Sequence, residues 1–210
     1  MEFGISEEGR IIEDQVLRFL NEKIIPSENT VQAEVAETSN GTDTQTMKAL
    51  RKEARNLGLW NLYLPDKEWG AGVSNHDYSI LCEHMGRSPI APRVFNCNAP
   101  DTGNAEILAE FGTEEQKQQW LTPLLEGQIR SCFSMTEPDT SGADPTGLRT
   151  AAVIDGDEWV INGHKWFTSG AIGARFAIAM VLTNPKGTAL ELASMIIVPT
   201  DAPGFELIRP

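Results

Sequence analysis

The sequence predicts an α+β protein: an all-α helical domain, residues 1–129, followed by an antiparallel β-barrel or sandwich domain, residues 130–210. Two observations predict this order. Up to Gly127 the apolar residues recur with the spacing that places them on one face of a helix. After Arg130 the chain consists of short β-branched or aromatic segments separated by Gly, Asn, Asp and Pro, which is typical of strands joined by turns.

Helices in the first domain are expected where a capping residue precedes an apolar face. The first, residues 6–25, is expected to end at Pro26, because proline inside a helix loses a hydrogen bond and clashes with the preceding turn. The polar stretch 27–46 is expected to be a partly helical surface connection. The other predicted helices cover residues 47–57, 74–86, 101–111 and 113–125, the last opened by a capping-box pattern at Thr113.

Short segments of the second domain are expected to be strands, namely residues 129–135, 149–154, 158–161, 165–168, 176–183, 194–199 and 205–210. Asp155-Gly156 and Asn162-Gly163 both predict hairpin turns, since Asn-Gly and Asp-Gly readily adopt the left-handed backbone that a two-residue turn needs.

The charge balance narrows the possible partners. The 210 residues contain 17 Lys and Arg against 30 Asp and Glu, a formal net charge of −13. This balance argues against a nucleic acid or an anionic membrane as partner, because both require a basic surface. No apolar run is long enough to span a membrane, and the N-terminus does not read as a secretory signal.

The cysteine and histidine positions do not predict a disulfide or metal site. The three cysteines show no C-x-x-C spacing and are expected to be reduced thiols: Cys82, Cys97 and Cys132. The three histidines are not at metal-ligand spacing, so no metal is expected: His76, His84 and His164.

The first candidate functional segment is S-C-F-S-M-T-E-P-D-T-S-G-A-D, residues 131–144. It begins as a strand and must leave the sheet at Pro138, which has no N–H to donate to a ladder. The open loop that follows exposes backbone N–H groups and hydroxyls together, which suits an anionic or heteroaromatic ligand. Asp144 is expected to stabilise a turn rather than to act as a catalyst.

The second candidate segment is N-G-H-K-W-F-T-S-G-A, residues 162–171. Its aromatic pair, Trp166 and Phe167, runs directly into the hydroxyl residues Thr168 and Ser169. Aromatic faces and hydroxyl donors in one segment can pack against a flat ring and hydrogen-bond its polar atoms.

These two segments closely resemble motifs of the acyl-CoA dehydrogenase family of flavoenzymes. Three further segments resemble the family as well, residues 98–104, 112–117 and 124–127. The resemblance covers essentially the whole chain but only about the N-terminal half of a family member. It implies a β domain incomplete at its C-terminal end, FAD as cofactor and a place in fatty acid β-oxidation, in a bacterial cytoplasm or a mitochondrial matrix.

The resemblance also implies roles for individual residues. Thr136 corresponds to a threonine that hydrogen-bonds the polar edge of the flavin, with the backbone of residues 133–136 alongside. Phe167 is expected to cover the ring and Ser169 to donate near flavin N5; a register shifted by one residue would choose Trp166 and Thr168 instead. The implied cofactor-binding set is Phe133, Ser134, Met135, Thr136, Ser141, Gly142, Phe167, Thr168 and Ser169. Ala143 stands where other members have a serine and is the candidate substrate contact.

The implied reaction is α,β-dehydrogenation of an acyl-CoA thioester, with hydride transfer to flavin N5. The catalytic base of the family comes from a C-terminal domain that matches no segment here, so this chain alone is expected to be inactive. The implied partners are acyl-CoA, an electron-transferring flavoprotein and, at full length, further copies in a homo-oligomer. Two alternatives stay open: an acyl-CoA oxidase or nitroalkane oxidase-like relative, and a non-catalytic fragment for CoA-ester binding or assembly.

Overall fold

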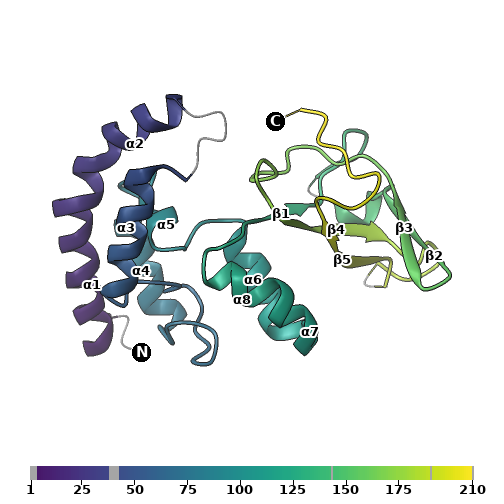
Figure 1. Ribbon diagram of the computed structural model, residues 1–210. Helices are drawn as coiled ribbons and strands as arrows, with labels where there is room; N and C mark the ends of the chain where they lie inside the picture. The colour runs from purple at the N-terminus through teal and green to yellow at the C-terminus, as the bar shows by residue number, and fades with distance from the viewer. Residues whose placement is uncertain (1–3, 38–42, 143, 190, 210) are drawn as a thin grey trace. The chain divides into compact units, whose positions relative to one another are not determined.

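The computed structural model describes residues 4–37, 43–142, 144–189 and 191–209. The chain divides into two compact units, Met1–Gly127 and Gln128–Pro210 (Figure 1). A helical unit followed by a sheet unit confirms the predicted order of the fold. The sheet itself is mixed and open, where the sequence predicted an antiparallel barrel or sandwich.

The helical unit contains the predicted helices and one short helix that was not predicted. Its elements are α1 (Glu7–Phe19), the π-helical turn η1 (Leu20–Ile24), α2 (Ile25–Glu37), α3 (Gln45–Asn56), α4 (Asn75–Met85), α5 (Ala91–Val94), α6 (Asp101–Phe111), α7 (Glu114–Gln116), the π-helical turn η2 (Lys117–Leu121) and α8 (Thr122–Leu125). Ser6, Ser74 and Thr113 accept backbone N–H groups of the first helical turn through their side chains, which confirms the cap predicted at Thr113 and the helix starts predicted at residues 6 and 74.

Pro26 does not end the first helix, contrary to the prediction. Helical structure continues from α1 through η1 into α2, and the Ile25 N–H bonds the carbonyl of Leu20, five residues back. A wider turn at this point changes the hydrogen-bond pattern that the proline ring would otherwise disrupt, so helical structure continues past Pro26. The same arrangement recurs at Pro123, where the Thr122 N–H bonds the carbonyl of Lys117.

The core of the helical unit is built from large apolar side chains of several helices and of the segments between them. Phe19 and Phe95 meet edge to face, with ring centroids 5.9 Å apart. The fully buried members include Val16, Leu20, Ile24, Leu59, Leu62, Leu81, Met85, Phe95, Leu121 and Leu124.

Two buried asparagines fasten the loops of this unit. The Asn96 amide donates to Asn61 Oδ1 at 2.7 Å, and the Asn61 amide donates to the carbonyl of Leu125 at 3.0 Å. Both asparagines adopt a left-handed backbone, with φ of 54° at Asn61 and 55° at Asn96. Asparagine tolerates this conformation better than most residues, and the amide pair satisfies polar groups that burial would otherwise leave without partners.

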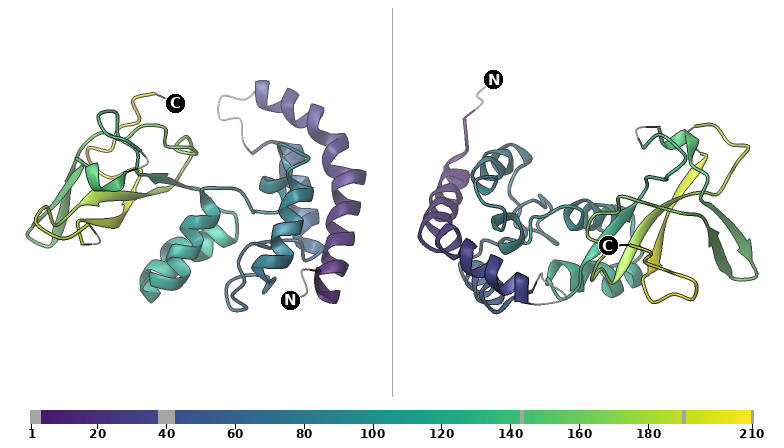
Figure 2. Two further views of the ribbon diagram at one scale, coloured as in Figure 1. Left: turned by 180° about the vertical axis from the view of Figure 1, so that it is seen from behind. Right: turned by 90° about the horizontal axis from the view of Figure 1, so that it is seen from above.

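Five strands form the sheet in the described part of the second unit: β1 (Ser131–Ser134), β2 (Ala151–Asp155), β3 (Glu158–Asn162), β4 (Phe176–Leu182) and β5 (Ala193–Pro199). The central strand β4 pairs with β1 in parallel and with β5 antiparallel. β2 and β3 form an antiparallel hairpin (Figure 2). The strand pairing of this hairpin with β4 is limited to Ala151 and Leu182. The parallel pairing arises because the chain passes through this hairpin between β1 and β4 and returns in the same direction.

One of the two predicted hairpin turns is confirmed. Gly156 has φ of 63° and lies in the two-residue turn between β2 and β3. Asn162-Gly163 does not form a hairpin, and neither residues 165–168 nor 205–209 form a strand. After β3 the chain instead runs as an irregular segment toward the end of β1, where its backbone and a lysine side chain make other hydrogen bonds.

We expect Thr113→Ala to lower the free energy of unfolding by about 1 kcal/mol, because it removes the hydroxyl that accepts the Gln116 N–H. The same substitution at Thr102, inside α6, is the control; it should leave stability unchanged or slightly higher, because alanine has the better helix propensity. Chemical denaturation of both variants measures the difference. Equal losses at the two positions would contradict a capping role for Thr113.

Candidate functional site

The two segments singled out by the sequence meet just beyond the end of β1. Lys165 Nζ donates to the carbonyl of Met135 at 2.9 Å and lies 2.8 Å from Glu137 Oε1. Between these two contacts, the Trp166 N–H donates to the carbonyl of Thr136 at 3.0 Å. Lys165 and Trp166 therefore hydrogen-bond to three consecutive residues of the other segment, residues 135–137.

Glu137 is the most enclosed charged group of this region, with 3% of its side chain exposed. Its carboxylate also accepts the backbone N–H of Arg149 at 2.7 Å and that of Thr150 at 2.9 Å. Glu137 thus joins the segment after β1, the segment before β2 and, through Lys165, the segment after β3.

The surroundings of Glu137 keep its carboxylate charged. Burial by itself would raise its pKa, but the hydrogen bonds from Lys165, Thr150 and Arg149 outweigh burial and lower the pKa to about 2. Burial also lowers the pKa of Lys165, an effect opposed by the hydrogen bond and the charge of Glu137. The contact is therefore a buried ion pair whose carboxylate is further satisfied by backbone amides.

Thr136 lies half-buried between these anchors and is covered by the loop that follows. A Cβ atom added at Gly142 would lie 3.1 Å from Thr136 Cγ2 and 3.2 Å from Thr136 Oγ1, so the loop backbone packs directly against the threonine. Asp144 accepts the Thr146 N–H at 3.0 Å, and this hydrogen bond supports its predicted turn-stabilising role.

The aromatic pair after Lys165 is largely exposed. Phe167 has 80% of its surface accessible and Trp166 has 40%, and their ring centroids lie 4.6 Å apart with 39° between the planes. Phe167 adopts φ of 51°, a left-handed conformation that is unusual for a bulky residue and costs conformational energy. Exposed aromatic faces on a strained backbone are typical of a ligand-binding segment.

The nine candidate cofactor residues occupy two neighbouring stretches of backbone. Phe133 and Ser134 end β1, Met135 and Thr136 follow it, and Ser141 and Gly142 lie in the covering loop; Phe167, Thr168 and Ser169 follow Trp166. The hydrogen bonds bring Met135 and Thr136 to Lys165 and Trp166. Ala143, the candidate substrate contact, lies outside the described residues.

Sequence reasoning overlooked the partnership of Glu137 and Lys165. Both stood in the motifs that suggested the site, but neither was assigned a role. The signal that was available is Glu137, the first acidic residue after the strand of one segment, and Lys165, the one lysine or arginine in the other. Charged residues are rarely fully buried unless they are paired, so such an opposite pair is a candidate contact.

A hollow of about 230 Å³ lies on the Glu137 side of this region, lined by Glu137, Pro138, Asp139, Arg149, Thr150, Gly163 and His164. Gly163 approaches Thr150 closely, since a Cβ atom added at Gly163 would lie 2.2 Å from Thr150 Oγ1 and 2.5 Å from Thr150 Cβ. Asn162-Gly163 is therefore explained by close packing and not by a hairpin turn.

We expect the stability of the protein to depend on Glu137 in a pH-dependent way. Because its folded pKa of about 2 lies below its ordinary value of 4.5, the carboxylate adds stability that is fully present above about pH 4.5 and is lost as the pH falls toward 2. Glu137→Gln should lower the free energy of unfolding by about 3 kcal/mol at neutral pH, and the gap to the wild type should narrow below about pH 4.5. Chemical denaturation at several pH values measures this difference in the free energy of unfolding, and Glu158→Gln, at an exposed position, is the control. A difference that does not change with pH would contradict the stabilising role of the Glu137 carboxylate.

Gly163→Ala should destabilise the protein by about 1–3 kcal/mol, because Thr150 is buried and β-branched and cannot easily give way to a methyl group. Gly103→Ala is the matched control: a Cβ there has open space and lies within α6, so this variant should be stabilised slightly. Thermal unfolding compares the two. A Gly163→Ala protein as stable as the wild type would rule out the tight approach to Thr150.

The described residues contain no helix that is long and apolar enough to cross a membrane and no cluster of side chains suited to a metal ion.

Comparison with known proteins gives concordant results over both units. The sequence model of the acyl-CoA dehydrogenase N-terminal domain matches residues 6–128, and that of the acyl-CoA dehydrogenase middle domain matches residues 132–210. Acyl-CoA dehydrogenase family member 10 of Mus musculus is 42% identical over 214 residues, which are 99% of this chain and 20% of that protein.

Solved structures show the same relationship. A structure from Mycobacterium abscessus assigned to the acyl-CoA dehydrogenases has a TM-score of 0.90 at 43% identity, covering 96% of this chain and 52% of the other. A glutaryl-CoA dehydrogenase from Mycobacterium smegmatis in complex with FADH2 has a TM-score of 0.71 at 26% identity, covering 95% and 47%. The chain thus spans about half the length of these solved relatives. The two domain matches together account for nearly all of it, and the chain belongs to the acyl-CoA dehydrogenase family.

Proposed function

We propose that this chain provides the flavin-facing part of an FAD-dependent acyl-CoA dehydrogenase, which removes hydrogen from the α and β carbons of an acyl-CoA thioester. When bound, FAD supplies the hydride acceptor at N5 of its ring. The observation that carries the proposal is the junction of residues 135–137 with Lys165 and Trp166, which places Thr136 beside a segment of exposed aromatic and hydroxyl residues.

The groups at this junction fit an isoalloxazine ring chemically. Such a ring needs a flat apolar wall and hydrogen-bond donors at its polar edge. Phe167 and Trp166 offer exposed aromatic faces, and the hydroxyls of Thr136, Thr168 and Ser169 are donors. A strained Phe167 backbone that exposes 80% of the residue is more readily explained by a bound partner than by packing within this unit.

Each residue of the set has a distinct proposed role. Thr136 donates to the polar edge of the ring, with the backbone of residues 133–136 alongside. Phe167 covers one face of the ring and Ser169 donates near N5, while Thr168 supports the segment through its carbonyl, which accepts the Ala171 N–H. Ser141 and Gly142 are proposed to contact the cofactor pyrophosphate, and Ala143 the substrate.

The wider function is proposed from family membership. The catalytic base that takes the α-proton is proposed to lie outside residues 1–210, so this chain alone is not expected to turn over. The substrate is an acyl-CoA, the acceptor for electrons is an electron-transferring flavoprotein, and the full-length protein is a homo-oligomer. The FADH2 found with the glutaryl-CoA dehydrogenase relative supports the choice of cofactor.

The test of the proposal is a titration of the purified chain with FAD, followed by removal of the unbound cofactor and an absorption spectrum. A resolved flavin band carried by folded protein is expected. A full-length version should then reduce that flavin on addition of an acyl-CoA and pass electrons to an electron-transferring flavoprotein. Rapid reoxidation by oxygen instead would favour an oxidase, and a colourless full-length protein that still binds CoA esters would favour a non-catalytic binding role.

We expect Phe167→Ala to weaken FAD binding by about tenfold, because it removes the aromatic wall of the proposed site. Stacking of a nucleic-acid base on one aromatic side chain contributes about 1–3 kcal/mol, and a flavin ring offers a comparable flat face. Trp166→Ala is the matched control, since it removes the neighbouring ring of the same pair and should weaken binding less. Quenching of flavin fluorescence measures both affinities. The opposite ranking would assign the contact to Trp166 and Thr168, one residue earlier in the register.

A further inference from the structure

We propose that Glu137 and Lys165 act as positioning residues, holding the backbones of Thr136 and Phe167 in the arrangement that the flavin ring requires. This inference rests on the proposed FAD site. It assigns a role to two residues that contact one another and the backbone, without themselves touching the cofactor.

The hydrogen bonds around Thr136 show how its direction is fixed. Lys165 Nζ bonds the carbonyl of the residue before it and the side chain of the residue after it, at 2.9 and 2.8 Å. The Trp166 N–H bonds the carbonyl of Thr136 itself. With contacts on residues 135, 136 and 137, neither peptide group next to Thr136 can rotate without breaking a hydrogen bond, so the direction in which its side chain leaves the backbone is fixed.

The same pair restrains the aromatic segment. Phe167 follows Lys165 by two residues and holds a left-handed φ of 51° that an isolated chain would rarely adopt. Conformations of this kind persist only where the surrounding structure determines them. The Lys165 side chain and the Trp166 N–H are the two anchors that precede Phe167, so loss of the pair should release Phe167 toward an ordinary backbone conformation.

Burial makes the anchor firm. Lys165 and Glu137 have 12% and 3% of their side chains exposed, so water competes little for their hydrogen bonds. The pair is neutral as a whole, and the Arg149 and Thr150 amides satisfy the remaining capacity of the carboxylate. Its influence on a bound ring is therefore expected through position and not through a net charge.

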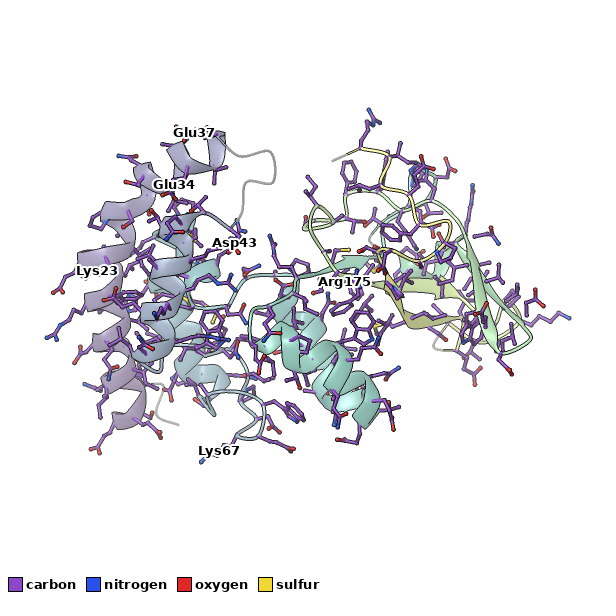
Figure 3. The ribbon with its side chains drawn as sticks, in the orientation of Figure 1. Lys23, Glu34, Glu37, Asp43, Lys67 and Arg175 are labelled. Carbon is purple, nitrogen blue, oxygen red and sulfur yellow. The ribbon has the colours of Figure 1, made fainter. Side chains whose placement is uncertain are left out.

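The experiment compares FAD binding by the wild-type chain with that of Glu137→Gln, Lys165→Met and the double variant. The matched control is Asp201→Asn, which breaks the ion pair of Asp201 with Arg175 in the same unit (Figure 3 labels Arg175). The two charged atoms of this pair lie 2.7 Å apart, and the side chains of Arg175 and Asp201 are 54% and 58% exposed. Circular dichroism reports whether each protein is folded. FAD affinity and the absorption spectrum of the bound flavin at saturation are the readouts.

Each single variant should weaken FAD binding by at least about tenfold, the lower end of what loss of a supporting partner costs at metal sites. The bound flavin should also lose the resolution of its absorption band, which a change in overall stability alone would not cause. The double variant should bind FAD no more weakly than the more impaired single variant, because each single substitution already removes the shared interaction. Unchanged affinity and spectrum in folded variants would overturn the inference while leaving the proposed function intact.

The double variant and hydrogen exchange of the wild-type chain test the inference even where a single variant does not fold. Should the single variants fail to fold because one charge is left buried, the double variant carries no such charge and is the one measured. Hydrogen exchange of the wild-type Trp166 amide gives a reading without any substitution: it should be protected before FAD is added, and a freely exchanging amide would overturn the inference. A wild-type chain that binds no FAD would instead overturn the proposed function.

Discussion

The buried ion pair between Glu137 and Lys165 is the interaction on which the candidate site depends. Removing two charges from water is costly, and their attraction compensates only where further hydrogen bonds complete the arrangement. Here the Arg149 and Thr150 amides and the Met135 carbonyl do so. Three segments distant in sequence are thereby joined at one point, although none of them belongs to a regular strand there. The geometry of the loops is consequently set by polar contacts and not by the sheet.

Near this anchor the aromatic side chain that would meet a ligand is exposed and its backbone is strained, whereas the ion pair that supports it is buried. Phe167 is 80% accessible in a left-handed conformation, and Glu137 is 3% accessible. Strain of this kind is maintained by the surrounding structure and is commonly found at binding sites. A site is preorganised for its ligand when rigid, buried residues hold the exposed contact groups in place.

The helices of the first unit were largely predictable because their signals are local. Thr113, Ser74 and the apolar spacing lie within one or two turns of the helices they define. Pro26 was misread because its usual effect presumes an unbroken α-helical hydrogen-bond pattern, and a π-helical turn ahead of it removes that condition. The Asn162-Gly163 hairpin was misread because the same dipeptide also suits a close approach of two backbones, here against Thr150.

The sequence by itself determined the order of a helical and a sheet unit, most helix boundaries, and the two segments that form the candidate site. These properties depend on the spacing of apolar residues and on capping or turn chemistry, which act over a few residues. Only the tertiary structure decided that β1 and β4 are parallel, that Lys165 reaches Glu137, and that Phe167 is strained. Each of these features joins residues 28 or more positions apart or depends on such a contact. The local preferences of the chain do not specify which distant partner a strand or a charged side chain will meet.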